Sequence, residues 1–205
     1  MKLCLNVSHR QRGLSLIVVM LILVVVTILG IGGAQIALLG ERSTRYDRDY
    51  LVATQSAEAA LMDAEYDIRG PNTDPNTRVA SFTAGNIGIF VSGCGTGTGQ
   101  GLCMPPDDAA KPVWATVDFL DATTGAHTVA FGAFTGRIFK SGSTGVQPEL
   151  APRYIIEVVD DLMPGGNAGA SASPRPKMYR VTAIGFGPRK EVQVVMQTAF
   201  RKEKG

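Results

Sequence analysis

An uncharged apolar segment near the N-terminus limits what this chain can fold into more than any other feature. The 27 residues 14–40 contain no Asp, Glu, Lys or Arg, and most of them are Val, Leu and Ile. As a helix rising about 1.5 Å per residue, the segment would be roughly 40 Å long, which is enough to cross a lipid bilayer. The chain is therefore not expected to be a purely soluble cytosolic protein.

The charges around this segment predict its orientation. Residues 1–13 contain Lys2, Arg10 and Arg12 and no acidic residue. Subtracting these three from the 20 basic residues of the chain leaves 17, against 18 acidic ones, so the remainder is nearly neutral. Because a basic flank stays in the cytoplasm while the following chain crosses the membrane, we expect a single pass with the C-terminal part outside the cytoplasm.

A regular hydrophobic repeat continues beyond the apolar segment. Apolar or aromatic residues recur in steps of three and four, at Tyr46, Tyr50, Ala53, Ala57, Leu61, Ala64 and Ile68. This spacing places them in one stripe along a helix. Gly70-Pro71 then ends the repeat, since such a pair is a strong helix stop. We therefore predict one long helix that is apolar over residues 14–40 and amphipathic over residues 41–70.

The sequence also predicts local features of this helix, which we expect to run from Leu14 to Arg69. Two acidic residues each precede a basic residue by four positions, Glu41 before Arg45 and Glu65 before Arg69. Ion pairs at this spacing would stabilise the helix. Three glycines near its middle each lower helix propensity by about 1 kcal/mol relative to Ala. They are Gly30, Gly32 and Gly33. We expect a local bend or a melted turn there.

Residues 71–205 carry short β-like runs between Gly- and Pro-rich loops, which predicts a globular β-rich domain. The expected strands cover residues 113–120, 128–134, 153–159, 178–185 and 191–200. A loop over residues 164–176 and a tighter turn over residues 187–190 would join neighbouring strands, and short turns favour antiparallel pairing. With the amphipathic half-helix covering one face of a small antiparallel sheet, the predicted fold class is α+β.

Cysteine usage suggests one disulfide. Cys4 lies in the basic leader, so Cys94 and Cys103 are the only pair outside the cytoplasm. The residues between them are mostly Gly and Thr and are flexible enough to close a bond in an oxidising compartment. The alternative is a pair of free thiols in a loop.

Residue types that carry catalysis or metal binding are sparse. The candidates are two histidines and two pairs of adjacent aspartates: His9, His127, Asp107-Asp108 and Asp160-Asp161. A lone histidine in a leader or a turn is typically solvated or structural. Adjacent acids on an extended chain point to opposite faces, and neither pair has the glycine-spaced loop of calcium sites. We interpret both pairs as solvated loop charge.

No motif of enzyme or nucleotide chemistry occurs, neither G-x-S-x-G, a Walker loop, a metal-ligand spacing nor a dinucleotide fingerprint. We expect no enzyme activity, no cofactor and no metal. The basic tail of Arg201, Lys202 and Lys204 is interpreted as solubilising, so nucleic acid is not an expected partner. The single tryptophan, Trp114, would either pack on the sheet or serve as an exposed docking anchor.

The sequence Arg12-Gly13-Leu14-Ser15-Leu16 before the apolar helix resembles the class III leader of type IV pilins and pseudopilins. In that family a prepilin peptidase cuts after the glycine and methylates the new N-terminus. The resemblance implies cleavage between Gly13 and Leu14, with N-methylation of Leu14. The family usually has Phe at that first position, so Leu14 is a mild departure.

Further segments resemble the PilX-type minor pilins. They are residues 41–42, 55–61, 152–157, 179–183 and 194–200, together with Asp63 and Glu65. They cover the first 65 or so residues and the last 55, and the middle of the chain is unmatched. The resemblance implies the pilin fold: a long N-terminal helix packed on a small antiparallel sheet.

Val18 departs from the family pattern, because most pilins carry a glutamate at the fifth position after the cut. A carboxylate in hydrocarbon is costly unless it is paired, and in the family this one is thought to meet the N-terminus of the neighbouring subunit. A subunit with Val18 would suit the tip of a filament, like the K-type pseudopilin of type II secretion, which also lacks the glutamate. The alternative is a tolerant membrane anchor.

The resemblance implies a minor pilin that primes and caps a type IV pilus, and so supports twitching motility and attachment. It would be held in the bacterial inner membrane before assembly and in the filament afterwards. The implied partners are other minor pilins, the major pilin, a PilY-type tip adhesin, the prepilin peptidase and the inner-membrane assembly platform.

The sequence is also compatible with two other functions. One is a K-type minor pseudopilin of type II secretion, which shares the fold and the leader. The other is a signal-anchored periplasmic hydrolase or binding domain. Gly32-Gly33-Ala34 offers ordinary signal peptidase a small-x-small site, and cleavage there would leave a chain beginning at Gln35.

Overall fold

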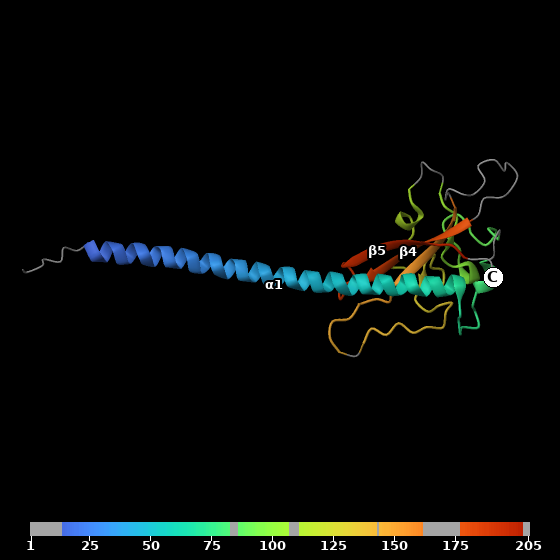
Figure 1. The fold of residues 1–205 in the computed structure, drawn as a ribbon, viewed down its shortest axis with the longest axis horizontal. Helices are drawn as coiled ribbons and strands as arrows, with labels where there is room; N and C mark the ends of the chain where they lie inside the picture. Colours follow the sequence, from blue (N-terminus) through green and yellow to red (C-terminus); the bar gives the residue numbers. More distant parts are fainter. Residues whose placement is uncertain (1–13, 83–85, 107–110, 143, 162–176, 203–205) are drawn as a thin grey trace, which may run out of the picture. The chain divides into compact units, whose positions relative to one another are not determined.

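The computed structural model describes residues 14–82, 86–106, 111–142, 144–161 and 177–202. The chain divides into two compact units, Met1–Asp47 and Arg48–Gly205. Helix α1, Leu14–Arg69, accounts for all the described structure of the first unit and supplies the only α-helix described in the second (Figure 1). The predicted end of the long helix at Arg69 is confirmed, and its predicted start, Leu14, is the first residue that the structure describes.

Helix α1 is unbroken at its three central glycines, so the melted turn expected there does not occur. A Cβ atom added at Gly30, Gly32 or Gly33 would meet nothing within 4 Å. The two predicted i,i+4 ion pairs form, at 2.5 Å between Arg45 and Glu41 and at 3.2 Å between Arg69 and Glu65.

The end of α1 has the geometry of a glycine cap. Gly70 has a φ of 74°, a left-handed conformation in which glycine is free of Cβ strain, and its N–H donates to the carbonyl of Tyr66 at 2.7 Å. The predicted stop at Gly70-Pro71 is therefore confirmed.

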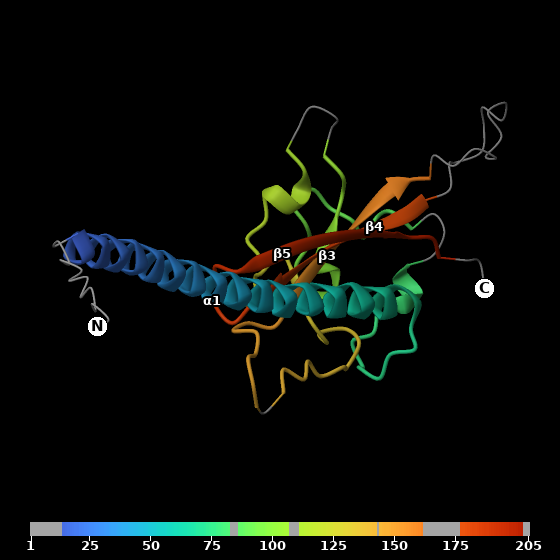
Figure 2. The same ribbon diagram turned by 60° about the vertical axis from the view of Figure 1, so that its left-hand side comes forward.

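The second unit contains one five-stranded sheet in the order β1-β3-β4-β5, with β2 also pairing with β3 (Figure 2). The long strands are β3 (Arg153–Asp160), β4 (Lys177–Phe186) and β5 (Gln193–Phe200), and they pair antiparallel. The short strands are β1 (Leu102–Cys103) and β2 (Val129–Ala130). Because β1 runs parallel to β3, the sheet is mixed rather than purely antiparallel.

Two of the five expected strands are corrected. Residues 113–120 contain the 3₁₀ turn η3 (Val113–Ala115), in which the N–H of Ala115 donates to Pro112 and that of Thr116 to Val113. The run expected over residues 128–134 shortens to β2, because the chain turns at Gly132, whose φ is 84°. The three remaining predicted strands are confirmed as β3, β4 and β5, and the expected loop over residues 164–176 lies outside the described residues.

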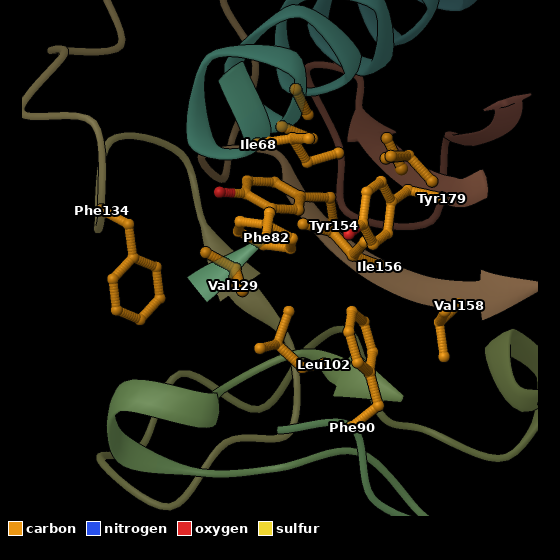
Figure 3. Packing of buried hydrophobic residues seen from close by; sticks show 14 residues of the cluster. Ile68, Phe82, Phe90, Leu102, Val129, Phe134, Tyr154, Ile156, Val158 and Tyr179 are labelled. Carbon is orange, nitrogen blue, oxygen red and sulfur yellow. The ribbon is translucent and has the colours of Figure 1, made fainter. Parts of the chain in front are cut away.

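A small-residue stripe of α1 packs on the sheet, as predicted from the repeat. Its fully buried members are Ala53, Ala57, Ala60, Ala64 and Ile68, whereas Tyr46, Tyr50 and part of Leu61 are exposed. The main core beneath it includes Tyr154, Ile156 and Val181, and Figure 3 shows Ile68 beside Tyr154 and Phe82. Backbones approach so closely at Gly185 that an added Cβ would lie 2.8 Å from the Ala57 Cα.

The opposite face of the sheet is also covered. Ile155, Ile184 and Phe186 point away from the α1 side and form a second core with residues of the 94–119 segment. Those residues are Cys94, Cys103, Val113 and Phe119, with Val117 at the margin. The sheet is thus buried between α1 and an irregular layer that contains the two cysteines.

Candidate functional site

The candidate catalytic residues of the sequence do not come together. His127 is exposed, and its Nδ1 lies 2.8 Å from the carbonyl oxygen of Cys94. Asp160 pairs with Lys177, and Asp161, which is buried, pairs with Arg201. These carboxylates are therefore ion-paired at the end of the sheet rather than solvated loop charge.

The other candidates give no site either. In the part of the chain that the structure describes, no group of three or more His, Cys, Asp or Glu residues could hold a metal ion. His9, Asp107, Asp108 and Lys204 lie outside the described residues.

The apolar half of α1 is the largest exposed hydrophobic surface of the first unit. Its Val, Leu, Ile and Met side chains between residues 16 and 39 are 45–72% exposed. The helix is long and apolar enough to cross a membrane, and no part of its most hydrophobic stretch is buried within the protein. Val18 is 50% exposed on this surface. Such a surface needs a lipid or protein environment to cover it.

The amphipathic half of α1 carries two fully buried aspartates that sequence reasoning missed. Asp67 is the centre of a polar cluster in the core: Arg78 donates to both of its carboxylate oxygens, at 3.0 Å from Nε and 2.6 Å from the terminal nitrogen. The Tyr154 hydroxyl donates to the same carboxylate at 2.9 Å. Burial, followed by the charge of Asp67, raises the pKa of Tyr154 well above its ordinary value, so that the hydroxyl stays a donor.

Arg78 also links α1 to the loop that contains the two cysteines. Its remaining nitrogen donates to the carbonyl oxygens of Thr98 at 3.2 Å and Gln100 at 2.7 Å. Its guanidinium lies 3.8 Å from the centre of the Phe134 ring. Since the side chain is almost completely buried, each of these contacts forms away from water and is correspondingly strong.

Asp63 holds a second loop against α1. Its carboxylate accepts the backbone N–H of Gly132 at 2.7 Å and the hydroxyl of Thr135 at 2.5 Å. Burial raises the pKa of Asp63 above its ordinary value of 3.8, against the lowering effect of these two hydrogen bonds. The loop that follows β2 is therefore positioned by the helix rather than by strand pairing.

The Cys94 and Cys103 sulfurs are bonded in the structure, and their Cα atoms lie 4.1 Å apart. Both residues are buried in the second core beneath the sheet, beside Ile155. Trp114 is 38% exposed and is not among the buried residues of either core. The disulfide and the buried aspartates together order a region with little regular secondary structure.

The helix and the sheet together define a class of protein. A long helix, apolar in its first half and packed in its second half on a small mixed sheet, is the α+β fold of pilin-like proteins. The functional elements of such a subunit are its helix surface and the surface of its globular domain.

Comparison with known families identifies the family. Residues 99–202 match the family described as Type IV pilus assembly protein PilX C-term, and residues 12–61 match PilX N-terminal. The chain therefore belongs to the PilX family and is a minor pilin of the type IV pilus, a structural component rather than a member of a known enzyme family. No curated protein and no solved structure gives a significant match.

Proposed function

We propose that this minor pilin primes assembly of the type IV pilus and caps its tip, together with other minor pilins and a PilY-type tip adhesin. The observation that carries the proposal is Val18, which leaves residues 14–40 without any carboxylate. In the pilins that this chain resembles, a glutamate at this position is thought to meet the N-terminus of the next subunit. A subunit without it suits the one position that has no subunit beyond it.

The proposed life of the subunit has two stages that use the same helix surface. Before assembly, residues 14–40 hold the protein in the bacterial inner membrane, with the N-terminus in the cytoplasm and the C-terminal domain in the periplasm. After the prepilin peptidase cuts between Gly13 and Leu14 and methylates Leu14, the helix leaves the bilayer for the filament core. An uncharged helix is suited to both places, because each is apolar.

The globular domain would determine the partners, which we take to be the other minor pilins, the major pilin, the tip adhesin and the inner-membrane assembly platform. Its role is assembly rather than catalytic turnover, and no cofactor enters it. Twitching motility and surface attachment would follow from the filament as a whole. The family match supports the pilus over the type II secretion alternative, and loss of secreted enzymes with intact pili on deletion would reverse that preference.

The proposal is tested by complementing a deletion strain with Val18→Glu, with Val18→Leu as the matched control. The number of surface pili and the twitching distance are measured, together with the membrane level of the protein. We expect the deletion to abolish piliation, the Leu variant to restore it and the Glu variant to fail although it accumulates normally. Normal piliation with Val18→Glu would contradict a tip position, and normal piliation of the deletion strain would contradict the function altogether.

A further inference from the structure

The two edges of the sheet are treated differently. On one side, β3 is covered by β1 and β2, which are only two residues long each, and β1 is tied to the disulfide loop. On the other side the sheet ends at β5, which has eight residues and pairs only with β4 among the described strands. Short, covered edges are how proteins prevent unwanted strand pairing, so the open edge at β5 is the exception.

The hydrogen-bonding pattern shows which groups of β5 face outward. The N–H of Gly187 donates to the carbonyl of Val192, and the β4–β5 register continues this pairing through alternate residues. The backbone groups of Val194, Met196, Thr198 and Phe200 therefore point to β4. Those of the residues between them point away from the sheet: Gln193, Val195, Gln197 and Ala199.

An independent bond on the far side of the sheet agrees with this assignment. The same alternation directs the N–H of Ile156 in β3 away from β4, and this N–H donates to Gly101 beyond the sheet at 2.8 Å. Within the described residues, no backbone hydrogen bond joins the outward groups of β5 to another segment. All four of these residues are exposed.

The composition of β5 lacks the usual protection of an edge strand. Its sequence from Gln193 to Phe200 contains no charged residue, no proline and no glycine. Val195 is 42% exposed at the outer face, and Met196 at the inner face is only half-buried. An uncharged, exposed edge of this length is a template for another strand.

A second copy of the chain does not fit this edge in a shared membrane. Strand β5 runs in the same direction as residues 48–69 of α1, since Val194 contacts Ala53 and Ala57 near its start and Arg201 accepts a bond from Arg69 after its end (Figure 2). If β5 of one copy paired symmetrically with β5 of a second copy through all four outward residues, the two strands would run antiparallel. Such pairing would reverse residues 48–69 in the partner copy, whereas in two copies anchored by residues 14–40 the chain would reach residue 48 from the membrane in both.

We propose that the open edge of β5 binds an extended segment of a different protein as an additional strand. The segment that fits is six to eight residues long and uncharged along its length, because β5 itself carries no charged side chain over its eight residues. Backbone hydrogen bonds would provide the binding energy, and the side chains of Gln193 and Gln197, which flank Val195 on the same face of β5, would set the selectivity. The exclusion of a second copy rests on the membrane anchoring in the proposed function, but the open edge does not.

The test uses the full chain in detergent micelles and a synthetic peptide, Asp-Thr-Val-Thr-Val-Thr-Val-Asp. Amide hydrogen exchange by NMR should show protection of Val195 and Gln197 rise at least tenfold on peptide addition, with the inward amides unchanged. A peptide with its central Val replaced by Pro is the control ligand. No alternating protection at millimolar peptide would overturn the proposal, and protection that rises with protein concentration alone would assign the edge to a second copy instead.

Substitutions in β5 provide a second test, and more than one is used because a single variant could misfold. Val195→Pro removes an outward N–H without touching the β4 ladder, and Val195→Thr keeps that N–H as the matched control. Gln197→Lys places a charge on the edge and leaves the backbone intact. We expect Pro and Lys to weaken peptide binding at least tenfold and Thr to leave it within threefold. Equal binding by all three variants would contradict strand addition, whatever the outcome for pilus assembly.

Discussion

Replacing Arg78 by Met tests whether the buried ion pair holds the globular domain together. Arg78 and Asp67 are both nearly or fully buried, and the guanidinium makes three contacts to the carboxylate of 3.1 Å or less. Without it, a buried carboxylate would keep only the Tyr154 hydroxyl as a side-chain partner. Breaking a buried pair in this way costs about 3–5 kcal/mol, because an uncompensated charge remains in the core.

The assay is urea denaturation of the full chain in micelles, followed by the fluorescence of Trp114, the single tryptophan. A loss of 3–5 kcal/mol corresponds to a fall in melting temperature of roughly 10 °C for a domain of this size. The matched control is Arg45→Met, which removes an arginine whose side chain is 68% exposed in its pair with Glu41 and should cost less than about 1 kcal/mol.

A double variant separates the charge from the packing. Arg78→Met combined with Asp67→Leu replaces both partners by apolar groups, and it should be more stable than Arg78→Met alone, since no lone charge remains. A loss of less than about 1 kcal/mol for Arg78→Met would contradict a stabilising buried ion pair, and so would a double variant that loses the sum of the two single losses.

Three further predictions address other contacts. Gly185→Ala should destabilise the domain by at least about 2 kcal/mol in the same urea assay, because the added Cβ would clash with the α1 backbone. The control Gly125→Ala should be nearly neutral, since its added Cβ would meet only a side-chain atom at 3.9 Å. Similar losses for the two variants would contradict the close approach at Gly185. Asp63 has a raised pKa in the folded state, so its contribution to stability is complete below its unfolded pKa near 3.8 and declines as the pH rises through the folded value. We therefore expect the free energy of unfolding of Asp63→Asn, relative to that of the unaltered chain, to be higher at pH 7 than at pH 4 when both are measured by denaturation. A change in the opposite direction would show that hydrogen bonding to Asp63 outweighs its burial. Replacing both Cys94 and Cys103 by Ser should lower the free energy of unfolding by about 2–3 kcal/mol, whereas Cys4→Ser should leave it unchanged. Equal melting curves for the double variant, Cys4→Ser and the unaltered chain would mean that the disulfide does not form.

The helix and the long strands could be predicted because each carries a periodic signal over many residues. The stripe from Ala53 to Ile68 repeats at helical spacing, and β3, β4 and β5 are rich in β-branched residues. Strands β1 and β2 are two residues long, which is too short for any period to show. The apolar residues 113–120 were expected to be a strand, but Val113 and Phe119 reach the second core from a turn.

The polar cluster could not be predicted, because a charged residue on an amphipathic helix normally faces solvent. Asp63 and Asp67 lie four residues apart, directly before Ala64 and Ile68 of the buried stripe, and Asp63 is also one of the residues that resemble the PilX-type minor pilins. Their partners, Arg78 and the loop after β2, are fixed by tertiary contacts that no local pattern specifies. Val18, in contrast, was readable directly as a departure from the pilin pattern.

The most direct test of the filament role is the N-terminal mass of the protein recovered from membranes and from sheared pili. We expect a chain that begins at Leu14 and carries one added methyl group, because the prepilin peptidase would mature a minor pilin in this way. A chain beginning at Gln35 would mean that ordinary signal peptidase releases a periplasmic protein, and one beginning at Met1 would mean a plain membrane anchor. Either of these two results would contradict the filament role.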